Sequence, residues 1–232
     1  MTLPTGAEKR AVVEAMFDRI ASRYDLMNRV MTFGVDRAWR RRAIAALRLR
    51  RGDRVLDLAC GSGDLTEEAQ ATGARVIGLD FSAGMLRAAQ ARRLGAALVR
   101  ADALALPLPD ASIDAVVSGF ALRNFVDLPA AFAESARVLR VGGRLALLEV
   151  DRPASRVLRL GHAVYFRQVV PLLGALISER AAYAYLPEST AYLPDAATLG
   201  ALLAAAGFAA IHKTPLMAGA AQLVTAERTA HA

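Results

Sequence analysis

The chain has 232 residues, of which 55% are hydrophobic and 22% are charged. This length and composition predict one globular domain and exclude a largely disordered chain. No uncharged apolar run reaches the roughly 20 residues that span a bilayer, and no signal-peptide pattern opens the sequence, so we expect a cytoplasmic protein. A single cysteine, Cys60, and three widely spaced histidines exclude an internal disulfide framework and predict no metal site.

The formal net charge is +7, and arginine carries almost all of the positive charge because only Lys9 and Lys213 are lysines. Such a balance is compatible with anionic ligands, an anionic membrane surface or nucleic acid, and equally with a general bias toward arginine. The clusters Arg40–Arg42 and Arg48–Arg51 are short and have no interleaved aromatic residues beyond Trp39. We therefore do not expect a nucleic-acid partner.

Residues 1–51 are predicted to form a helical N-terminal cap. Apolar residues recur at helical spacing after Glu8, a polar break falls near Tyr24–Asn28, and a second helical stretch runs over Trp39–Leu49.

From Arg54 onward, short apolar runs alternate with helical stretches. This alternation predicts a parallel sheet that helices cover on both faces, because such strands are buried on both sides and contain few polar residues. The fold class is thus predicted to be α/β, with a core over residues 52–232 that forms one structural domain with the cap. The five runs are Val55–Ala59, Arg75–Asp80, Ala97–Ala101, Ala115–Phe120 and Leu145–Val150.

The sequence after the fifth run predicts an insertion, a helix and the last strands. The long apolar and aromatic stretch Arg152–Leu186 breaks the alternation and indicates a helical insertion over about residues 152–190. A helix is then expected over Asp195–Ala206, where an aspartate provides the N-cap. Two final runs, Ala209–His212 and Gln222–Thr225, complete the predicted sheet.

Polar and glycine residues follow three neighbouring strands at the points where they end. The first strand runs directly into Gly61 and Gly63, whose backbone lets a ligand approach closely. Asp80 ends the second strand, where a carboxylate can accept hydrogen bonds from both hydroxyls of a ribose. Asp102 closes the third strand beside the backbone amide of Ala103, and this pair suits an adenine. The pattern indicates a site for an adenosyl ligand.

These residues resemble the motifs of class I S-adenosylmethionine methyltransferases, although Ala59 replaces the usual first glycine of the turn. The resemblance extends, in order and spacing, from about Val13 to Gly207, and the family it indicates is the quinone C-methyltransferases of menaquinone and ubiquinone biosynthesis. The segments that carry it are Phe17–Asn28, Trp39, Gly119–Asn124 and Arg137–Glu149.

The resemblance implies a Rossmann-like sheet, S-adenosyl-L-methionine as cofactor and a prenylated quinol, most simply demethylmenaquinol, as substrate. Loss of a proton from a quinol hydroxyl would make the neighbouring ring carbon nucleophilic toward the cofactor's methyl group. Ser118 has an alternative role as a small residue packed between strand and helix. The cofactor-binding residues that the resemblance implies are Asp57, Gly61, Ser62, Gly63, Asp80, Phe81, Asp102, Ala103 and Ser118.

The resemblance also places Arg123 and Asn124 over the substrate, where an arginine could stabilise a phenolate. Tyr24 could relay the proton directly or through a water molecule. Arg123 could instead form an ion pair with Asp127 at a helix start, and Tyr24 could simply pack the cap. Asp25 is expected to form a cap or turn.

The apolar insertion, about Val157–Ile177, would line a channel for the prenyl tail. Core packing or a homodimer interface explains the same residues. Arginines at Arg156, Arg159 and Arg167 are compatible with peripheral contact with anionic lipid, at the inner face of the membrane.

The sequence leaves several other functions open. Departures from the family's pattern at Thr32, Asp36, Val141, Asp151 and residues 219–223 leave the cofactor motifs intact but are compatible with another phenolic or hydrophobic acceptor. A cofactor-binding scaffold without turnover also remains. A nicotinamide dehydrogenase is disfavoured because its third glycine would stand where Thr66 does. The choice between a naphthoquinol and a benzoquinol ring is also open.

Overall fold

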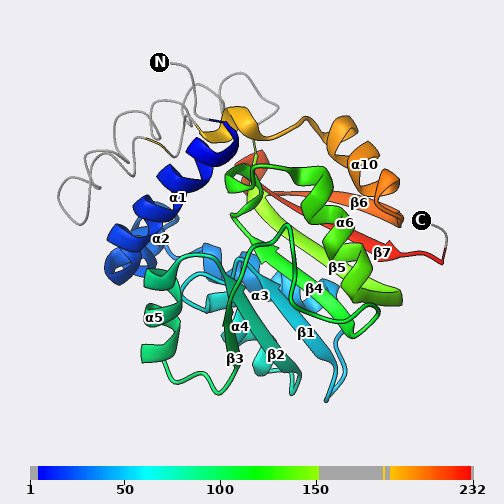
Figure 1. The fold of residues 1–232 in the computed structure, drawn as a ribbon, viewed down its shortest axis with the longest axis horizontal. Coiled ribbons are helices and arrows are strands. Elements are labelled where there is room, and N and C mark those ends of the chain that lie inside the picture. Colours follow the sequence, from blue (N-terminus) through cyan, green and yellow to red (C-terminus); the bar gives the residue numbers. More distant parts are fainter. Residues whose placement is uncertain (1–4, 152–184, 186–188, 231–232) are drawn as a thin grey trace.

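A seven-stranded sheet forms the centre of the computed structural model, which describes residues 5–151, 185 and 189–230 (Figure 1). The strand order is β3-β2-β1-β4-β5-β7-β6; the first five strands in the chain run parallel, and β7 is antiparallel to both β5 and β6. The predicted α/β class and the two final strands are thus confirmed. The strands are β1 (Arg54–Leu58), β2 (Arg75–Asp80), β3 (Ala97–Arg100), β4 (Ile113–Gly119), β5 (Leu139–Val150), β6 (Phe208–Leu216) and β7 (Ala221–Arg228).

The described helices connect these strands and precede them. Short 3₁₀ turns η1 (Ala21–Arg23), η2 (Leu122–Asn124), η4 (Thr190–Tyr192) and η5 (Met217–Gly219) lie between longer elements. The α-helices are α1 (Gly6–Ile20), α2 (Tyr24–Met31), α3 (Asp36–Ala46), α4 (Asp64–Gln70), α5 (Ala83–Ala91), α6 (Leu128–Val138) and α10 (Ala196–Ala205). The helix expected over Asp195–Ala206 is confirmed, and the Asp195 carboxylate caps it by accepting from the Thr198 amide at 2.8 Å.

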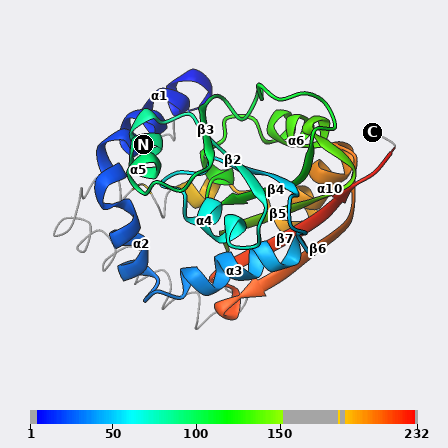
Figure 2. The same cartoon turned by 90° about the horizontal axis from the view of Figure 1, so that it is seen from below.

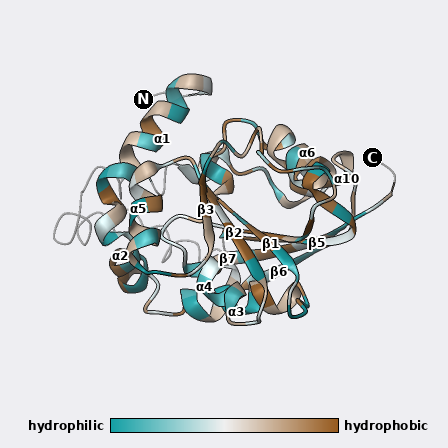
Figure 3. Cartoon of the chain, turned by 60° about the horizontal axis from the view of Figure 1, so that its bottom comes forward, coloured by the Kyte–Doolittle hydropathy of each residue, from teal (hydrophilic) through white to brown (hydrophobic). Residues whose placement is uncertain are grey.

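Helices cover the sheet on both faces (Figure 2). On one face, Phe132 of α6 and Leu203 of α10 pack against the strands in one apolar cluster. On the other face, Ile44 of α3 and Leu65 of α4 belong to a second cluster. Figure 3 shows the apolar residues concentrated along the strands, whereas polar residues lie on the outer sides of helices such as α4 and α5. Because the strands are buried on both faces, they appear in the sequence as apolar runs.

The strand order reverses between β1 and β4, where crevices for ligands open in such sheets. The carboxyl ends of β1, β2, β3 and β4 therefore meet at one edge. The turn after β1 depends on Gly63, whose φ is +91°, a value that suits glycine. A Cβ at this position would lie only 2.5 Å from Leu94 Cδ1. A close turn is thus built into the start of α4.

The N-terminal helices differ from the expectation. The polar break predicted near Tyr24–Asn28 is wrong, because these residues begin α2, and the chain turns at Ala21–Arg23 instead. Met27 and Met31, one turn apart, bury their side chains in a third apolar cluster with α1 and α5, which stabilises α2 despite its polar residues. α3 does not join this cluster but packs on the sheet.

The predicted insertion falls almost wholly outside the described residues, so the prenyl-channel and lipid-contact predictions for Val157–Ile177 and its arginines lie outside them too. Among the residues that are described, no helix has both the length and the apolar character needed to cross a membrane.

Candidate functional site

Asp57 lies inside the sheet at the end of β1 and is fully buried. Its Oδ2 accepts a hydrogen bond from Thr66 Oγ1 at 2.6 Å, whereas its Oδ1 has no partner. Burial raises the pKa of Asp57 to about 7. A buried carboxylate with an unused oxygen at the glycine turn fits a site that a polar ligand completes.

Asp80 is the last residue of β2, and both of its carboxylate oxygens are bound to backbone amides. Its Oδ2 accepts from the Gly61 amide and its Oδ1 from the Ser82 amide, each at 2.9 Å. A carboxylate oxygen has two lone pairs, so each oxygen can still accept a hydroxyl hydrogen. Burial raises the pKa of Asp80 to about 6, yet at neutral pH the group is mainly ionised. This geometry fits a ribose with two hydroxyls.

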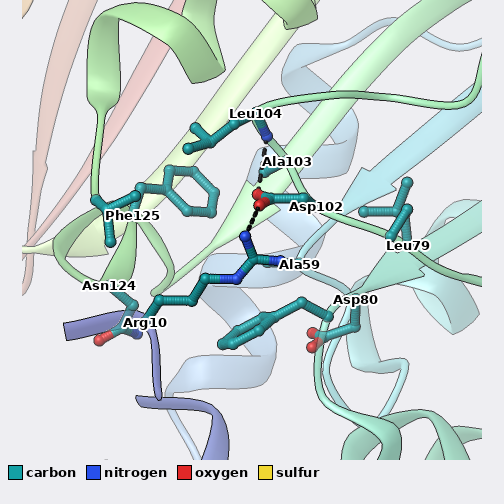
Figure 4. A pocket seen from close by; sticks show the side chains of 12 residues that line it. Arg10, Ala59, Leu79, Asp80, Asp102, Ala103, Leu104, Asn124 and Phe125 are labelled. Atoms are coloured by element: carbon teal, nitrogen blue, oxygen red, sulfur yellow. Dashed lines mark hydrogen bonds and ion pairs between the residues drawn. The ribbon is translucent and has the colours of Figure 1, made fainter. Parts of the chain in front are cut away.

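Asp102 and Asp80 line the same pocket, together with Phe81 and Ala103 (Figure 4). Asp102 Oδ1 accepts from the Leu104 amide at 3.0 Å, and its Oδ2 pairs with Nη1 of Arg10 at 2.8 Å. The structure therefore brings together the predicted ends of β2 and β3. The sequence did not indicate Arg10, because its only signal was one more arginine in the first helix.

The glycine turn after β1 contacts α2. The Ser62 hydroxyl donates to Oδ1 of Asp25, and Arg92 Nη1 donates to the Ser62 carbonyl at 3.1 Å. Asp25 thus binds the turn with its side chain, rather than serving as the cap or turn residue we expected. Ser118 of β4 is buried, and its hydroxyl donates to the Leu58 carbonyl at 2.7 Å.

Arg123 follows β4 and forms a buried ion pair with Glu149 near the end of β5. Glu149 Oε1 also accepts from the Val150 amide at 2.9 Å. The alternative pairing with Asp127 is wrong: Asp127 caps α6 by accepting from the Ala130 amide at 2.9 Å. Glu149 thus holds the guanidinium of Arg123 at the carboxyl end of the sheet.

Several buried polar atoms around this ion pair have no hydrogen-bond partner. They are Arg123 Nε, Glu149 Oε2 and Gln222 Oε1, whereas the unpaired Oδ1 of Asn124 belongs to a residue that lines the pocket of Asp80 and Asp102. Gln222 lies opposite Glu149 across the β5–β7 ladder, and its Nε2 donates to the Val150 carbonyl at 3.2 Å. Unpaired buried polar groups are uncommon, so three at one ion pair indicate a place for a polar ligand. The sequence did not single out Gln222, whose strand partner is far away in the chain.

Tyr24 packs the N-terminal cap, one of the two roles considered for it. Its ring meets that of Phe17 edge to face, with centroids 5.8 Å apart, so it packs the cap. It also lies within electrostatic range of Arg123. Burial raises the pKa of Tyr24, so its phenol stays protonated at neutral pH and can pass on a proton only while it receives another.

These donor and acceptor groups suit an adenosyl cofactor. The Asp80 carboxylate has lone pairs for ribose hydroxyls, and the Asp102 carboxylate beside the Ala103 amide offers an acceptor and a donor for an adenine edge. Within residues 5–151, 185 and 189–230, no group of three or more His, Cys, Asp or Glu side chains could hold a metal ion.

Known structures share this fold at low sequence identity. A SAM-dependent methyltransferase from Thermotoga maritima matches with a TM-score of 0.66 and 20% identity, covering 93% of this chain and 99% of that one. A phosphoethanolamine N-methyltransferase 2 from Haemonchus contortus, solved with S-adenosylhomocysteine, matches with a TM-score of 0.60 and 16% identity, covering 81% of this chain and 52% of that one. Both confirm the class I methyltransferase fold.

Closer relatives match nearly the whole chain. A demethylmenaquinone methyltransferase of Thermus thermophilus is 48% identical over 83% of this chain and 91% of that protein. One of Roseiflexus castenholzii is 44% identical over 96% of both, and a ubiquinone/menaquinone biosynthesis C-methyltransferase of Geobacter sulfurreducens is 38% identical over 95% of this chain and 90% of that protein. With residues 5–228 matching the family as a whole, the chain belongs to the ubiE/COQ5 methyltransferase family.

Proposed function

We propose that the chain transfers a methyl group from S-adenosyl-L-methionine to a ring carbon of demethylmenaquinol. The names of the relatives from Thermus and Roseiflexus favour this substrate. The observation that carries the proposal is a pair of adjoining polar sites at one sheet edge. One suits an adenosyl group, at Asp80 and Asp102, and the other surrounds the buried Arg123–Glu149 pair.

The bound cofactor would supply an electrophilic methyl group. Asp57, Asp80 and Asp102, with Ala103 and Phe81, would hold it, and Gly61, Ser62, Gly63 and Ser118 would shape the turn and crevice around it. Because the cofactor is itself reactive, the protein's main contribution is positioning and the exclusion of water.

Arg123 is proposed to stabilise the phenolate of the substrate. Its Nε has no partner, so it can donate to a phenolate oxygen while Nη1 stays on Glu149. The fixed guanidinium would favour the ionised hydroxyl in a site of low dielectric constant. Tyr24, whose pKa is raised by burial and lowered in part by the charge of Arg123, is proposed to act on the proton that leaves.

The acceptor atoms around Arg123 favour the reduced form of the substrate. Glu149 Oε2 and Gln222 Oε1 can accept hydrogen bonds but cannot donate them. A quinol has hydroxyl groups to donate, whereas a quinone has none. The unpaired acceptors thus support a dihydroxy aromatic ring.

The prenyl tail is proposed to lie along the apolar part of the insertion, about Val157–Ile177, with peripheral contact at the inner face of the membrane. Cosedimentation of the full chain with vesicles of neutral or anionic lipid tests the membrane contact. If the insertion forms a homodimer interface instead, light scattering would give twice the chain's mass and the vesicles would leave the protein in the supernatant.

The reaction is tested with purified protein, S-adenosyl-L-methionine and demethylmenaquinol, which is prepared by chemical reduction of demethylmenaquinone. The product is identified by mass spectrometry. Soluble phenols assayed in parallel separate a methyltransferase for another acceptor from the proposed one. Calorimetry with S-adenosylhomocysteine and with NAD tests the cofactor, and binding of NAD alone would contradict the proposal. A strain lacking the gene should accumulate demethylated menaquinone.

Arg123→Lys tests the proposed role of the guanidinium. Lysine keeps a charge opposite Glu149 but lacks Nε, so kcat should fall by roughly 100-fold or more. S-adenosylhomocysteine affinity should stay within about two-fold of the unsubstituted enzyme, because Arg123 does not line the adenosyl pocket. Turnover retained in Arg123→Lys would exclude Arg123 from the chemistry. If the unsubstituted chain binds S-adenosylhomocysteine but shows no turnover either, the protein is a cofactor-binding scaffold and not an enzyme.

A further inference from the structure

Helix α1 carries two ion pairs, one turn apart, to the residues that follow or end β3. Arg10 Nη1 contacts Asp102 Oδ2 at 2.8 Å, and Arg10 itself lines the pocket. Glu14 Oε1 contacts Arg100 Nη2 at 2.8 Å. Side chains four residues apart lie on the same face of a helix, so one face of α1 is directed at the adenine end of the pocket.

The same face continues to Asp18, where α1 is held much more tightly. Asp18 Oδ1 accepts from Ser82 Oγ at 2.6 Å and from the Gly84 amide at 2.7 Å. A Cβ on Gly84 would lie 2.8 Å from Asp18 Cα, so α1 and α5 meet without room for a side chain. This end of α1 is fixed on the start of α5.

The Arg10 and Glu14 ion pairs are more exposed to water than the contacts of Asp18. The Arg10 and Asp102 side chains are 53% and 28% exposed, and those of Arg100 and Glu14 are 59% and 31% exposed. Exposed ion pairs are weak and exchange readily with solvent. The Arg10 side chain can therefore leave Asp102 at little cost. The helix itself stays in place, because Lys9 is buried and donates from Nζ to the Phe125 carbonyl at 2.6 Å, and Asp18 holds the other end.

Through its ion pair with Arg10, Asp102 links α1 to the pocket that is proposed to bind the cofactor. Figure 4 shows the Arg10 side chain running across the pocket from α1 to Asp102, with Asn124 and Phe125 on one side and Asp80 on the other. Arg10 thus lies across the pocket and occupies an oxygen of the carboxylate that is proposed to meet the adenine.

We propose that the Arg10–Asp102 ion pair is a clasp across the adenosyl pocket, and that its opening sets how fast S-adenosylmethionine enters and S-adenosylhomocysteine leaves. The inference rests on the proposed function. Arg10 is a positioning residue, because it acts through Asp102 and does not touch the reacting carbon. Since the clasp must open both for binding and for release, its loss changes the association and dissociation rates more than it changes the equilibrium affinity.

The test follows the release of radiolabelled S-adenosylhomocysteine from the full chain after addition of excess unlabelled ligand. Arg10→Ala should release it about two- to five-fold faster, the range expected for one exposed ion pair. Arg41→Ala removes an equally basic, exposed side chain from α3 and should release it at the rate of the unsubstituted protein.

Glu14 and Arg100 give a second test with residues outside the proposed cofactor-binding set. Glu14→Arg alone should accelerate release because it places two arginines together, and Glu14→Arg with Arg100→Glu should restore the slower rate.

Equal or slower release from Arg10→Ala, with S-adenosylhomocysteine bound by the unsubstituted protein, would overturn the clasp and leave the proposed function standing. A chain that does not bind S-adenosylhomocysteine at all would overturn both.

Discussion

At the scale of single residues, Asp80 shows how one carboxylate can serve the backbone and a ligand together. Its two oxygens each accept one amide hydrogen bond and keep a second lone pair. Asp80→Asn replaces one oxygen with an NH₂ group, which would face the amide of Gly61 or Ser82 and could not accept from a ribose. We expect the affinity for S-adenosylhomocysteine to fall by about 30-fold or more, equivalent to about 2 kcal/mol, measured by calorimetry.

Asp110→Asn is the matched control for Asp80→Asn. The Asp110 side chain is 78% exposed and pairs with Arg137 away from the pocket, so this substitution should leave the affinity unchanged. An unaltered affinity in Asp80→Asn would mean that the carboxylate supports the turn only.

The acids at the strand ends could be predicted from the sequence, because parallel strands bring their carboxyl ends to one edge wherever the intervening chain runs. Arg10 and Gln222 could not be. Arg10 reaches Asp102 only through the placement of α1, and Gln222 meets Glu149 only through the antiparallel register of β7. Neither relation leaves a periodic signal in the sequence.

At the scale of elements, Gly84 and Gly200 are two helical glycines with opposite surroundings. A Cβ on Gly84 would lie 2.8 Å from Asp18 Cα, whereas one on Gly200 of α10 would meet nothing within 4 Å. Gly84→Ala should therefore push α1 and α5 apart and lower the free energy of unfolding by about 1–3 kcal/mol. Gly200→Ala should instead raise it by about 0.5–1 kcal/mol, since alanine favours the helix.

Urea unfolding of both variants measures this difference. If Gly84→Ala is as stable as Gly200→Ala, α1 and α5 leave room for a methyl group at Gly84, contrary to the 2.8 Å distance in the structure. Faster release of S-adenosylhomocysteine is also expected in Gly84→Ala, because the fixed end of α1 is displaced.

The strands were easier to predict than the N-terminal helices for a physical reason. Burial on both faces gives β1, β2 and β4 compact apolar runs with clear ends. The turn at Ala21–Arg23 contains neither glycine nor proline, so nothing in the sequence marks the boundary between α1 and α2. That boundary is set by where Met27 and Met31 find their apolar neighbours.

At the scale of the whole molecule, an apolar run in the sequence gives no strand direction. The two last runs were expected as strands, but only the structure shows that β7 lies antiparallel between β5 and β6. This arrangement brings the start of β7 to the carboxyl edge of the parallel strands. It thereby places Gln222 beside the buried Arg123–Glu149 pair.

The buried carboxyls at this edge should make the stability of the whole protein depend on pH. Burial raises the pKa of Asp57 to about 7 and that of Asp80 to about 6, above the roughly 3.9 of an unfolded aspartate. Between about pH 4 and 7 the folded chain keeps protons that the unfolded chain has released. The free energy of unfolding should therefore fall as the pH rises, by about 2–4 kcal/mol from pH 5 to 8.

Asp57→Asn separates this effect from other titrations, because its neutral side chain can still accept from Thr66. It should flatten the larger part of the slope and leave the variant more stable than the parent at pH 8, but not at pH 5. Urea titrations at four pH values, followed by the fluorescence of the single tryptophan, Trp39, give the slope. Groups with lowered pKa values, such as Asp36 and Glu134, titrate below this window and do not contribute to it. Equal slopes in the two proteins would show that the Asp57 carboxyl is ionised in the folded chain throughout, and that the site compensates its charge.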